Sequence, residues 1–193
     1  MQIVHYPHPT LRFESQAIRR VDNELRGIAR TMFDLMYEAS GVGLAANQVA
    51  LPIRMFVVNL ESDPTEGDEL VFVNPIVSRH RGGFEEKEEG CLSLPGMYAP
   101  VKRPKIIDIH AFTLDGHEIK CSADGLFGRV LQHENDHLDG VLFTDRISDT
   151  AKLDVREELD EFEAEYRCLR ETGQIGGADE ISADHERWRS KYC

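Results

Sequence analysis

Residues 133–137 read His-Glu-Asn-Asp-His, with two histidines four positions apart and a glutamate directly after the first. Leu126 and Val130 precede His133 and His137 at a spacing of i, i+4, i+7 and i+11, which predicts a helix with both histidines on one face. Side chains four residues apart on a helix lie one above the other, so the two imidazoles can bind one metal ion. A catalytic metal site normally has three protein ligands. The third ligand must therefore come from another part of the chain.

Hydrophobic patterns on the N-terminal side of this helix predict further elements. Apolar residues between positions 25 and 36 follow the period of a helix, and Asp22 is placed to cap it. The histidine helix itself is expected to have Ser122 or Asp124 as its cap and to end at Gly140. Runs rich in Val, Ile and Phe predict strands over residues 54–60, 70–77 and 106–113.

The pair Asp115-Gly116 is a hairpin signal, because both residues tolerate the backbone conformation of a tight turn. It joins the strand predicted over 106–113 to a short run over 118–121, so the sheet is expected to be largely antiparallel. These patterns together predict an α+β fold, in which largely antiparallel sheets surround a central metal-binding helix. A C-terminal helix and a polar extension are expected to follow.

The composition limits the classes of function. With 193 residues the chain fits one domain of ordinary size, and its net charge of −13 would repel the phosphates of a nucleic acid. No stretch approaches the roughly 20 apolar residues of a membrane-spanning helix, and we find no export signal. The four cysteines are widely scattered, which argues against a disulfide framework. We therefore expect a cytoplasmic protein that binds neither nucleic acid nor membrane.

Two other segments have unusual composition. Residues 41–48 read Gly-Val-Gly-Leu-Ala-Ala-Asn-Gln, too small for a packed core and too apolar for a solvated loop, so their backbone is expected to approach another group closely. Residues 89–96 read Glu-Gly-Cys-Leu-Ser-Leu-Pro-Gly and place Cys91 between a glycine and a Pro-Gly stop. A lone cysteine is most often an inert buried residue. From the residues alone, cysteines, other histidines and carboxylates all remain candidates for the third ligand.

Three segments together resemble the signature motifs of the peptide deformylase family, namely residues 41–48, 89–93 and 132–140. They follow the family's order and spacing, and the resemblance covers roughly the first 150 to 170 residues. It implies a metal-dependent hydrolase that removes the formyl group from the N-terminal formyl-methionine of newly synthesised polypeptides and releases formate. The implied partner is the nascent polypeptide, which would bring the enzyme close to the ribosome.

The resemblance also implies a metal site. It assigns Cys91, His133 and His137 as the ligands of one divalent transition metal ion per chain, iron(II) in the cell, with zinc, nickel or cobalt as alternatives. The chemistry of the side chains agrees, because a thiolate and two imidazoles suit these ions, whereas magnesium and calcium prefer oxygen ligands.

Three catalytic roles follow from the same resemblance. Glu134 would take the proton of the attacking water and later give it to the leaving amine. The side-chain amide of Gln48 and the backbone N–H of Leu92 would stabilise the oxyanion of the tetrahedral intermediate. Behind the cysteine segment, Glu89 and Arg103 are expected to form a supporting ion pair.

The residues expected to contact the substrate are Val42, Gly43, Gly90, Tyr98, Leu126 and Val130. Val42, Leu126 and Val130 would form an apolar pocket for methionine, and plain core packing is the alternative for all three. Small residues such as Gly43 would give clearance to a peptide that pairs with their strand. Tyr98 is expected near the exit of the peptide.

Two other functions remain open from the residues alone. An H-E-x-x-H endopeptidase would more usually have a histidine or a carboxylate as its third ligand, and the Glu-Gly-Cys-Leu-Ser segment argues against it. A metal-stabilised binding module would have a closed fourth position and no use for Glu134. Comparing the hydrolysis of formyl-methionine, acetyl-methionine and internal peptide bonds distinguishes the three.

The end of the chain is expected to differ from the rest. We divide the chain into a catalytic domain over 1–172 and a polar C-terminal extension over 173–193. A helical stripe of apolar residues lies within 159–169, on a segment acidic enough to be repelled by ribosomal RNA. The extension after Gly173 is polar enough to be loosely held and dispensable for the chemistry.

Overall fold

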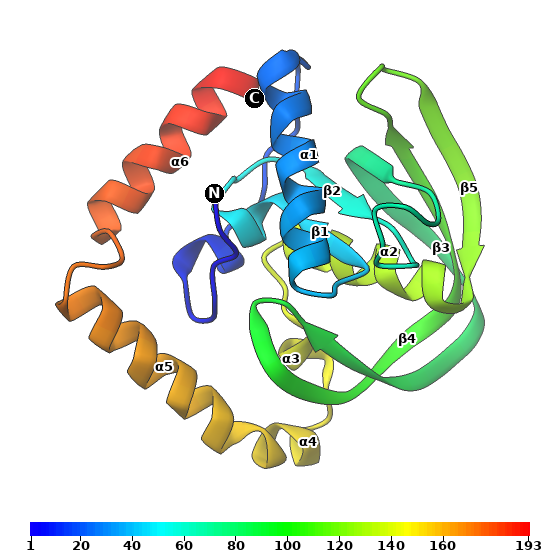
Figure 1. The fold of residues 1–193 in the computed structure, drawn as a ribbon. Coiled ribbons are helices and arrows are strands. Elements are labelled where there is room, and N and C mark those ends of the chain that lie inside the picture. The colour runs from blue at the N-terminus through cyan, green and yellow to red at the C-terminus, as the bar shows by residue number, and fades with distance from the viewer.

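The computed structural model describes all residues from Met1 to Cys193, and its centre is one antiparallel sheet (Figure 1). The strands are β1 (Gly43–Ala45), β2 (Met55–Val58), β3 (Leu70–Cys91), β4 (Leu94–Phe112) and β5 (Glu118–Asp124). They lie in the order β1-β2-β3-β4-β5, and every neighbouring pair is antiparallel. The predicted α+β fold with a largely antiparallel sheet is confirmed.

Six helices and two short 3-10 turns accompany the sheet. The helices are α1 (Asn23–Glu38), α2 (Gly125–Leu138), α3 (Phe143–Arg146), α4 (Asp149–Asp154), α5 (Arg156–Glu171) and α6 (Ala178–Tyr192). The 3-10 turns are η1 (Pro9–Arg12) and η2 (Ala46–Val49). The helix predicted after Asp22 is confirmed, because the Asp22 side chain accepts a hydrogen bond from the backbone N–H of Leu25 (3.0 Å). Asp124 directly precedes α2, but its side chain makes no capping bond, and Ser122 lies within β5.

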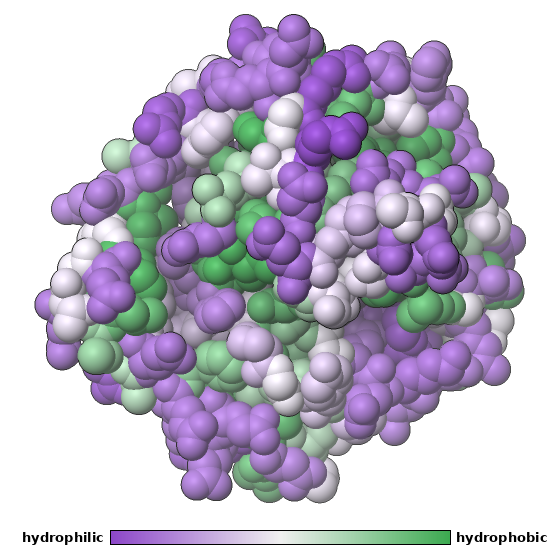
Figure 2. Space-filling view, viewed as in Figure 1, coloured by the Kyte–Doolittle hydropathy of each residue, from purple (hydrophilic) through white to green (hydrophobic).

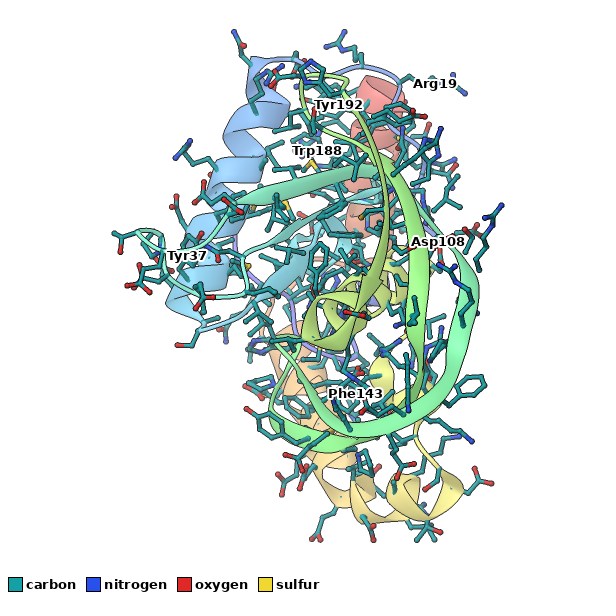
Figure 3. The ribbon with its side chains drawn as sticks, turned by 90° about the vertical axis from the view of Figure 1, so that its right-hand side faces the viewer. Arg19, Tyr37, Asp108, Phe143, Trp188 and Tyr192 are labelled. Atoms are coloured by element: carbon teal, nitrogen blue, oxygen red, sulfur yellow. The ribbon has the colours of Figure 1, made fainter.

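The strand β2 is buried on both faces and separates two hydrophobic cores. Met55 and Val57 point to the core that contains the apolar face of α1. Phe56 and Val58 point to the core that contains α2, because successive side chains of a strand point in opposite directions. Helix α2 therefore lies at the centre of the molecule, and the long ribbon of β3 and β4 curves around it (Figure 3).

The strands β3 and β4 are much longer than the runs predicted over 70–77 and 106–113. The additional length of β3, after residue 77, is mostly polar and exposed and carries no hydrophobic pattern. In the additional length of β4, Met97, Ala99 and Val101 are buried and alternate with exposed residues. The two added lengths pair with each other through their backbones. The extended pairing carries Cys91 to the end of β3, next to α2.

The end of the chain is not loosely held, so that expectation is wrong. Helices α5 and α6, which we call the C-terminal arm, form an arc beside the body of the protein (Figure 1). No side chain of α5 is fully buried, but Tyr192 at the end of α6 is only 1% exposed and packs in the core beside α1. Its hydroxyl donates a hydrogen bond to Asp22 (3.0 Å), and Trp188 stacks on its ring (Figure 3). Two aromatic residues four positions apart are enough to anchor a polar helix.

Ending the chain at Thr172 is expected to lower the thermal midpoint while leaving the metal and the activity in place. The deletion removes the buried side chain of Tyr192 and half-buried Trp188, each worth about 1.5 to 3 kcal/mol when fully buried. No residue of α6 lines the cavity described below. Differential scanning calorimetry and an assay well below the midpoint check both parts. Tyr192→Phe, which loses only the hydrogen bond, should shift the midpoint less, and a folded but inactive truncated chain would contradict this prediction.

Acid is expected to weaken the attachment of the arm, because two buried histidines lie between it and the body. The Thr10 hydroxyl lies 2.7 Å from His185 Nε2, and the Thr10 backbone N–H donates to His8 Nδ1. Burial, His185 and Arg170 lower the pKa of His8 to about 4, and burial also lowers the pKa of His185. In the unfolded chain a histidine gains a proton near pH 6.5, whereas these two stay neutral to lower pH in the folded protein. The free energy of unfolding therefore falls as the pH drops from about 6.5 toward 4.

The midpoint of His8→Gln should therefore depend less on pH over this range than that of the unsubstituted protein. Thermal melts in buffers of equal ionic strength measure the difference. The solvent-exposed His117 provides the matched control, because His117→Gln should leave the pH dependence unchanged. If the midpoints of the unsubstituted protein and of His8→Gln depend on pH in the same way, His8 is not a source of the acid sensitivity.

Candidate active site

Cys91, His133 and His137 bring one ligand atom each into a cluster whose atoms all lie within 4.8 Å of one another. Cys91 Sγ is 3.2 Å from His137 Nε2, and the two imidazole rings lie with their centroids 5.0 Å apart. The thiol comes from the end of β3 and both imidazoles come from one face of α2. The three residues proposed as ligands are therefore close enough to share one ion.

The donor set and its surroundings fit a divalent transition metal. A thiol and two imidazoles are three ligands of the type that such ions prefer, and a tetrahedral ion would keep a fourth position. His137 is fully buried and its burial lowers its pKa, which favours the neutral ring that binds metals. Glu134 Oε2 is buried beside the cluster without a hydrogen-bond partner. A buried carboxylate oxygen without a partner is explained if a water on the ion donates to it.

A buried ionic network behind the cluster orients His133. Glu89 accepts hydrogen bonds from Arg103 Nε (2.6 Å), Arg129 Nη1 (2.6 Å) and His133 Nδ1 (3.1 Å). Burial alone would raise the pKa of Glu89, but the bonds from His133 and Arg103 outweigh it and hold this pKa at about 2. The ionised Glu89 fixes the proton on Nδ1, so Nε2 of His133 is free to bind a metal.

The Glu89–Arg103 pair of this network was expected from the sequence, whereas Arg129 and Asp136 were not. Arg129 precedes His133 by four residues, and this helical spacing on the same face of α2 could have identified it. Asp136 is buried and accepts from Arg103 (2.7 Å) and from Arg146. No local sequence pattern indicates the role of Asp136, because its partners lie on β4 and α3.

Glu134 is buried against the backbone of β1. It is 4% exposed, and burial raises its pKa to about 7. A Cβ atom on Gly43 would lie 2.5 Å from Glu134 Oε1, so only glycine leaves room for this carboxylate. The close approach predicted for residues 41–48 is therefore present, and at Gly43 the neighbouring group is the carboxylate of Glu134.

Gln48 has its amide group oriented toward the cluster. Its Oε1 accepts a hydrogen bond from the backbone N–H of Ala45 (2.8 Å), so its Nε2 points away from Ala45. Nε2 lies 3.2 Å from Ser93 Oγ and 3.5 Å from Cys91 Sγ. The carboxamide thus presents its donor group to the metal cluster.

A cavity of about 620 Å³ opens onto the cluster. The sequence-predicted residues that line it are Val42, Gly43, Gln48, Gly90, Cys91, Leu92, Tyr98, Leu126, Val130, His133 and Glu134. His137 lies behind them, fully buried. Val130 also belongs to the α2 core, so the core-packing alternative holds in part for this residue.

Two exposed side chains form the rim of this cavity. Leu126 is 56% exposed and Tyr98 is 62% exposed, which is unusual for large apolar or aromatic residues. Tyr98 lies over Gly90, where a Cβ atom would come within 2.6 Å of the ring. Gly90 therefore allows Tyr98 to lie flat at the mouth of the cavity.

Comparison with known proteins identifies the family. A profile of the polypeptide deformylase family matches residues 1–153, which includes the cluster and the cavity. The chain belongs to the polypeptide deformylase family. Members of this family are enzymes that remove N-formyl groups from nascent polypeptides. Membership excludes both alternatives left open above, the endopeptidase and the binding module without catalysis.

Individual relatives of this deformylase agree with the profile. A peptide deformylase of Rhodopirellula baltica is 46% identical over 192 residues, which cover 100% of this chain and 95% of the relative. A crystal structure of Arabidopsis thaliana peptide deformylase 1B with an inhibitor superposes with a TM-score of 0.84 at 42% identity, covering 90% of this chain and 94% of the other. The crystal structure of a Synechococcus elongatus peptide deformylase in complex with actinonin superposes with a TM-score of 0.76 at 38% identity. The match covers 90% of this chain and 88% of the other. None of the helices in our deformylase combines the length and the apolar composition required to cross a bilayer.

Proposed function

We propose that this deformylase uses one divalent transition metal ion to hydrolyse the formamide bond of N-terminal formyl-methionine, with release of formate. The observation that carries the proposal is the Cys91, His133 and His137 cluster with the buried, unpartnered carboxylate oxygen of Glu134 beside it. An ion held by the three ligands supplies Lewis acidity, which lowers the pKa of a water molecule toward neutrality.

Glu134 is the proton carrier of the proposed reaction. Its unpartnered Oε2 accepts a proton from the attacking water, and the same oxygen then delivers that proton to the departing amine. A pKa raised by burial suits both duties, because the group must hold the proton between the two steps.

Two donors of this chain are assigned to the oxyanion that forms when water attacks the formyl carbon. The Gln48 amide is already held by its bond to Ala45, so it need not reorganise when charge develops. The backbone N–H of Leu92 is the second donor, next to the ligand Cys91.

Substrate recognition is assigned to the cavity and to the edge of the sheet. Val42, Leu126 and Val130 provide apolar walls for the methionine side chain. Strand β1 is an edge strand, so the peptide backbone can add beside it as a further strand. Tyr98 at the rim and Gly90 beneath it are assigned to the region where the peptide leaves the cavity.

The decisive experiment compares three peptides of one sequence. Protein purified without oxygen and loaded with iron(II) should release formate from formyl-Met-Ala-Ser, no acetate from acetyl-Met-Ala-Ser, and no amino acid from Met-Ala-Ser. Hydrolysis of the acetyl peptide at a similar rate, or cleavage of an internal peptide bond, would refute the proposal. Metal analysis of the same preparation identifies the ion, with zinc, nickel and cobalt as alternatives to iron(II).

Gln48→Ala is expected to lower kcat by roughly 100- to 1000-fold, the usual effect of removing one oxyanion donor. KM should change little, because the interaction is made mainly in the transition state. Steady-state kinetics on formyl-Met-Ala-Ser separate the two constants. If the substitution raises KM alone, Gln48 positions the substrate and does not stabilise the oxyanion.

The proposed partner is the nascent formyl-methionyl chain, and the proposed location is the cytoplasm near ribosomes. All four cysteines are free thiols, which is compatible with a reducing compartment. The Arabidopsis thaliana relative named chloroplastic/mitochondrial makes an organelle the alternative location. Fractionation of cells that express the protein, probed with an antibody, distinguishes the two.

A further inference from the structure

Two residues near the start of the chain are bonded to the two segments that carry the assigned oxyanion donors. The backbone N–H of Val4 donates to the carbonyl oxygen of Gln48 (2.8 Å). The backbone N–H of Tyr6 donates to the carbonyl oxygen of Ser93 (2.9 Å), and Ser93 directly follows Leu92. The segment from Val4 to Tyr6, which we call the N-terminal bridge, thus joins segments that are 45 positions apart in the chain.

The 3-10 turn η2, which carries Gln48, has little stability of its own. It has only four residues, and its last carbonyl groups have no partner within the turn. Ala50, directly after it, has a φ of 63°, which costs energy for a residue with a Cβ atom. Asn47 attaches η2 to α2 by donating to the carbonyl oxygen of His137. The N–H of Val4 gives the Gln48 carbonyl its partner and adds a second attachment.

The other end of the bridge holds the turn between β3 and β4. Cys91 pairs with Leu94, so this turn consists of Leu92 and Ser93. The amide of Gln48 also donates to Ser93 Oγ (3.2 Å), but the same amide has only two hydrogens and must direct one of them to the oxyanion. The bridge joins the two segments through backbone groups and therefore leaves this amide free for the reaction.

We propose that the N-terminal bridge sets the position of the two oxyanion donors relative to each other. Val4 and Tyr6 are then positioning residues that act through their backbone N–H groups. The inference rests on the proposed function, because that function assigns the donors. Two residues of extended chain span no more than about 7 Å, so the bridge is short and leaves the two carbonyls little freedom. Stabilisation of an oxyanion requires donors that are aimed in advance.

The bridge is attached by its backbone more than by side-chain packing. The side chain of Val4 is half-buried and belongs to none of the hydrophobic cores. Together with residues of α5 it lines a cavity of about 510 Å³. Figure 2 shows apolar side chains in this hollow between the C-terminal arm and the body. Replacing the side chain of Val4 should therefore cost little stability, so its N–H can be tested separately.

The test is Val4→Pro, which removes the N–H that the Gln48 carbonyl accepts from. We expect kcat for formyl-Met-Ala-Ser to fall roughly 10- to 100-fold, because a small displacement of a group at the reacting centre costs up to about 100-fold. KM and the metal content should stay within a factor of about two. Steady-state kinetics and metal analysis of the full chain, loaded with metal, measure these quantities.

Two matched controls should keep kcat within a factor of about two of the unsubstituted protein. Val4→Ala removes most of the side chain but keeps the N–H. Gln2→Pro introduces a proline into the same exposed stretch, at an N–H that makes no hydrogen bond in the chain. An unchanged kcat in Val4→Pro, or an equal fall in Val4→Pro and Val4→Ala, would overturn the inference.

Combination with Gln48→Ala separates positioning from a general loss of stability. If Val4 acts through Gln48, Val4→Pro has no amide left to misplace in Gln48→Ala protein, and it should lower kcat there by less than about threefold. All four proteins are assayed well below their thermal midpoints. An equal fold-decrease in both backgrounds would overturn the inference, because the substitution would then act on the whole protein.

Val4→Gly provides a second test if Val4→Pro does not fold. Glycine keeps the N–H but frees the backbone of the bridge, so kcat should fall several-fold where Val4→Ala leaves it unchanged. This fall should also disappear in Gln48→Ala protein. Equal kcat values for Val4→Gly and Val4→Ala would overturn the inference. Absence of formate from the unsubstituted protein would instead overturn the proposed function.

Discussion

Glu134→Gln is expected to lower kcat by at least 100-fold while the protein keeps its full complement of metal. Glutamine has nearly the shape of glutamate, so it fits the space that Gly43 leaves, but it cannot accept the proton of the attacking water. The loss of a general base typically costs 100- to 10,000-fold. Formate release and metal content, measured on the same preparation, check both parts.

Glu88→Gln is the matched control for this substitution. Glu88 lines the same cavity but is exposed on β3, so removing its charge should leave kcat within a factor of about two. A Glu134→Gln protein with unchanged turnover would show that another group carries the proton. Loss of metal from this variant would show that Glu134 helps to hold the ion.

Cys91→Ala is expected to lose the metal and, with it, all measurable deformylation. The two imidazoles that remain cannot hold an ion that needs three protein ligands, and alanine offers no donor atom. Metal analysis after gel filtration, together with formate release, measures the effect. Cys121→Ala is the matched control, because Cys121 is an exposed free thiol on β5. Full metal occupancy in Cys91→Ala would exclude the thiol as a ligand.

Local patterns predicted those elements of the fold whose signal lies within one segment. The apolar period after Asp22 and the spacing from Leu126 to His137 each correspond to a helix of the structure. The pair Asp115-Gly116 lies at the turn between β4 and β5, as its backbone preferences indicate. In each case, neighbours in the sequence are also neighbours in space.

The features that sequence analysis did not predict depend on contacts between distant segments. Nothing near Tyr192 indicates that its ring enters a core, because the rest of that core is supplied by α1 and the sheet. The polar half of β3 forms a strand because it pairs with β4, not because of its own composition. Similarly, the residues alone left the third ligand open, because only the long β3 strand brings Cys91 to His137.

The hydrogen bond between Tyr192 and Asp22 joins positions 170 residues apart. Synthesis proceeds from the N-terminus, so α1 emerges long before the segment that completes its packing has been made. Contacts of such high separation also close slowly, because a long loop must be ordered first. Until then, part of the apolar face of α1 stays accessible to water and to other chains. The body of the protein therefore folds before its last core residue is in place, which agrees with the activity expected of the chain that ends at Thr172.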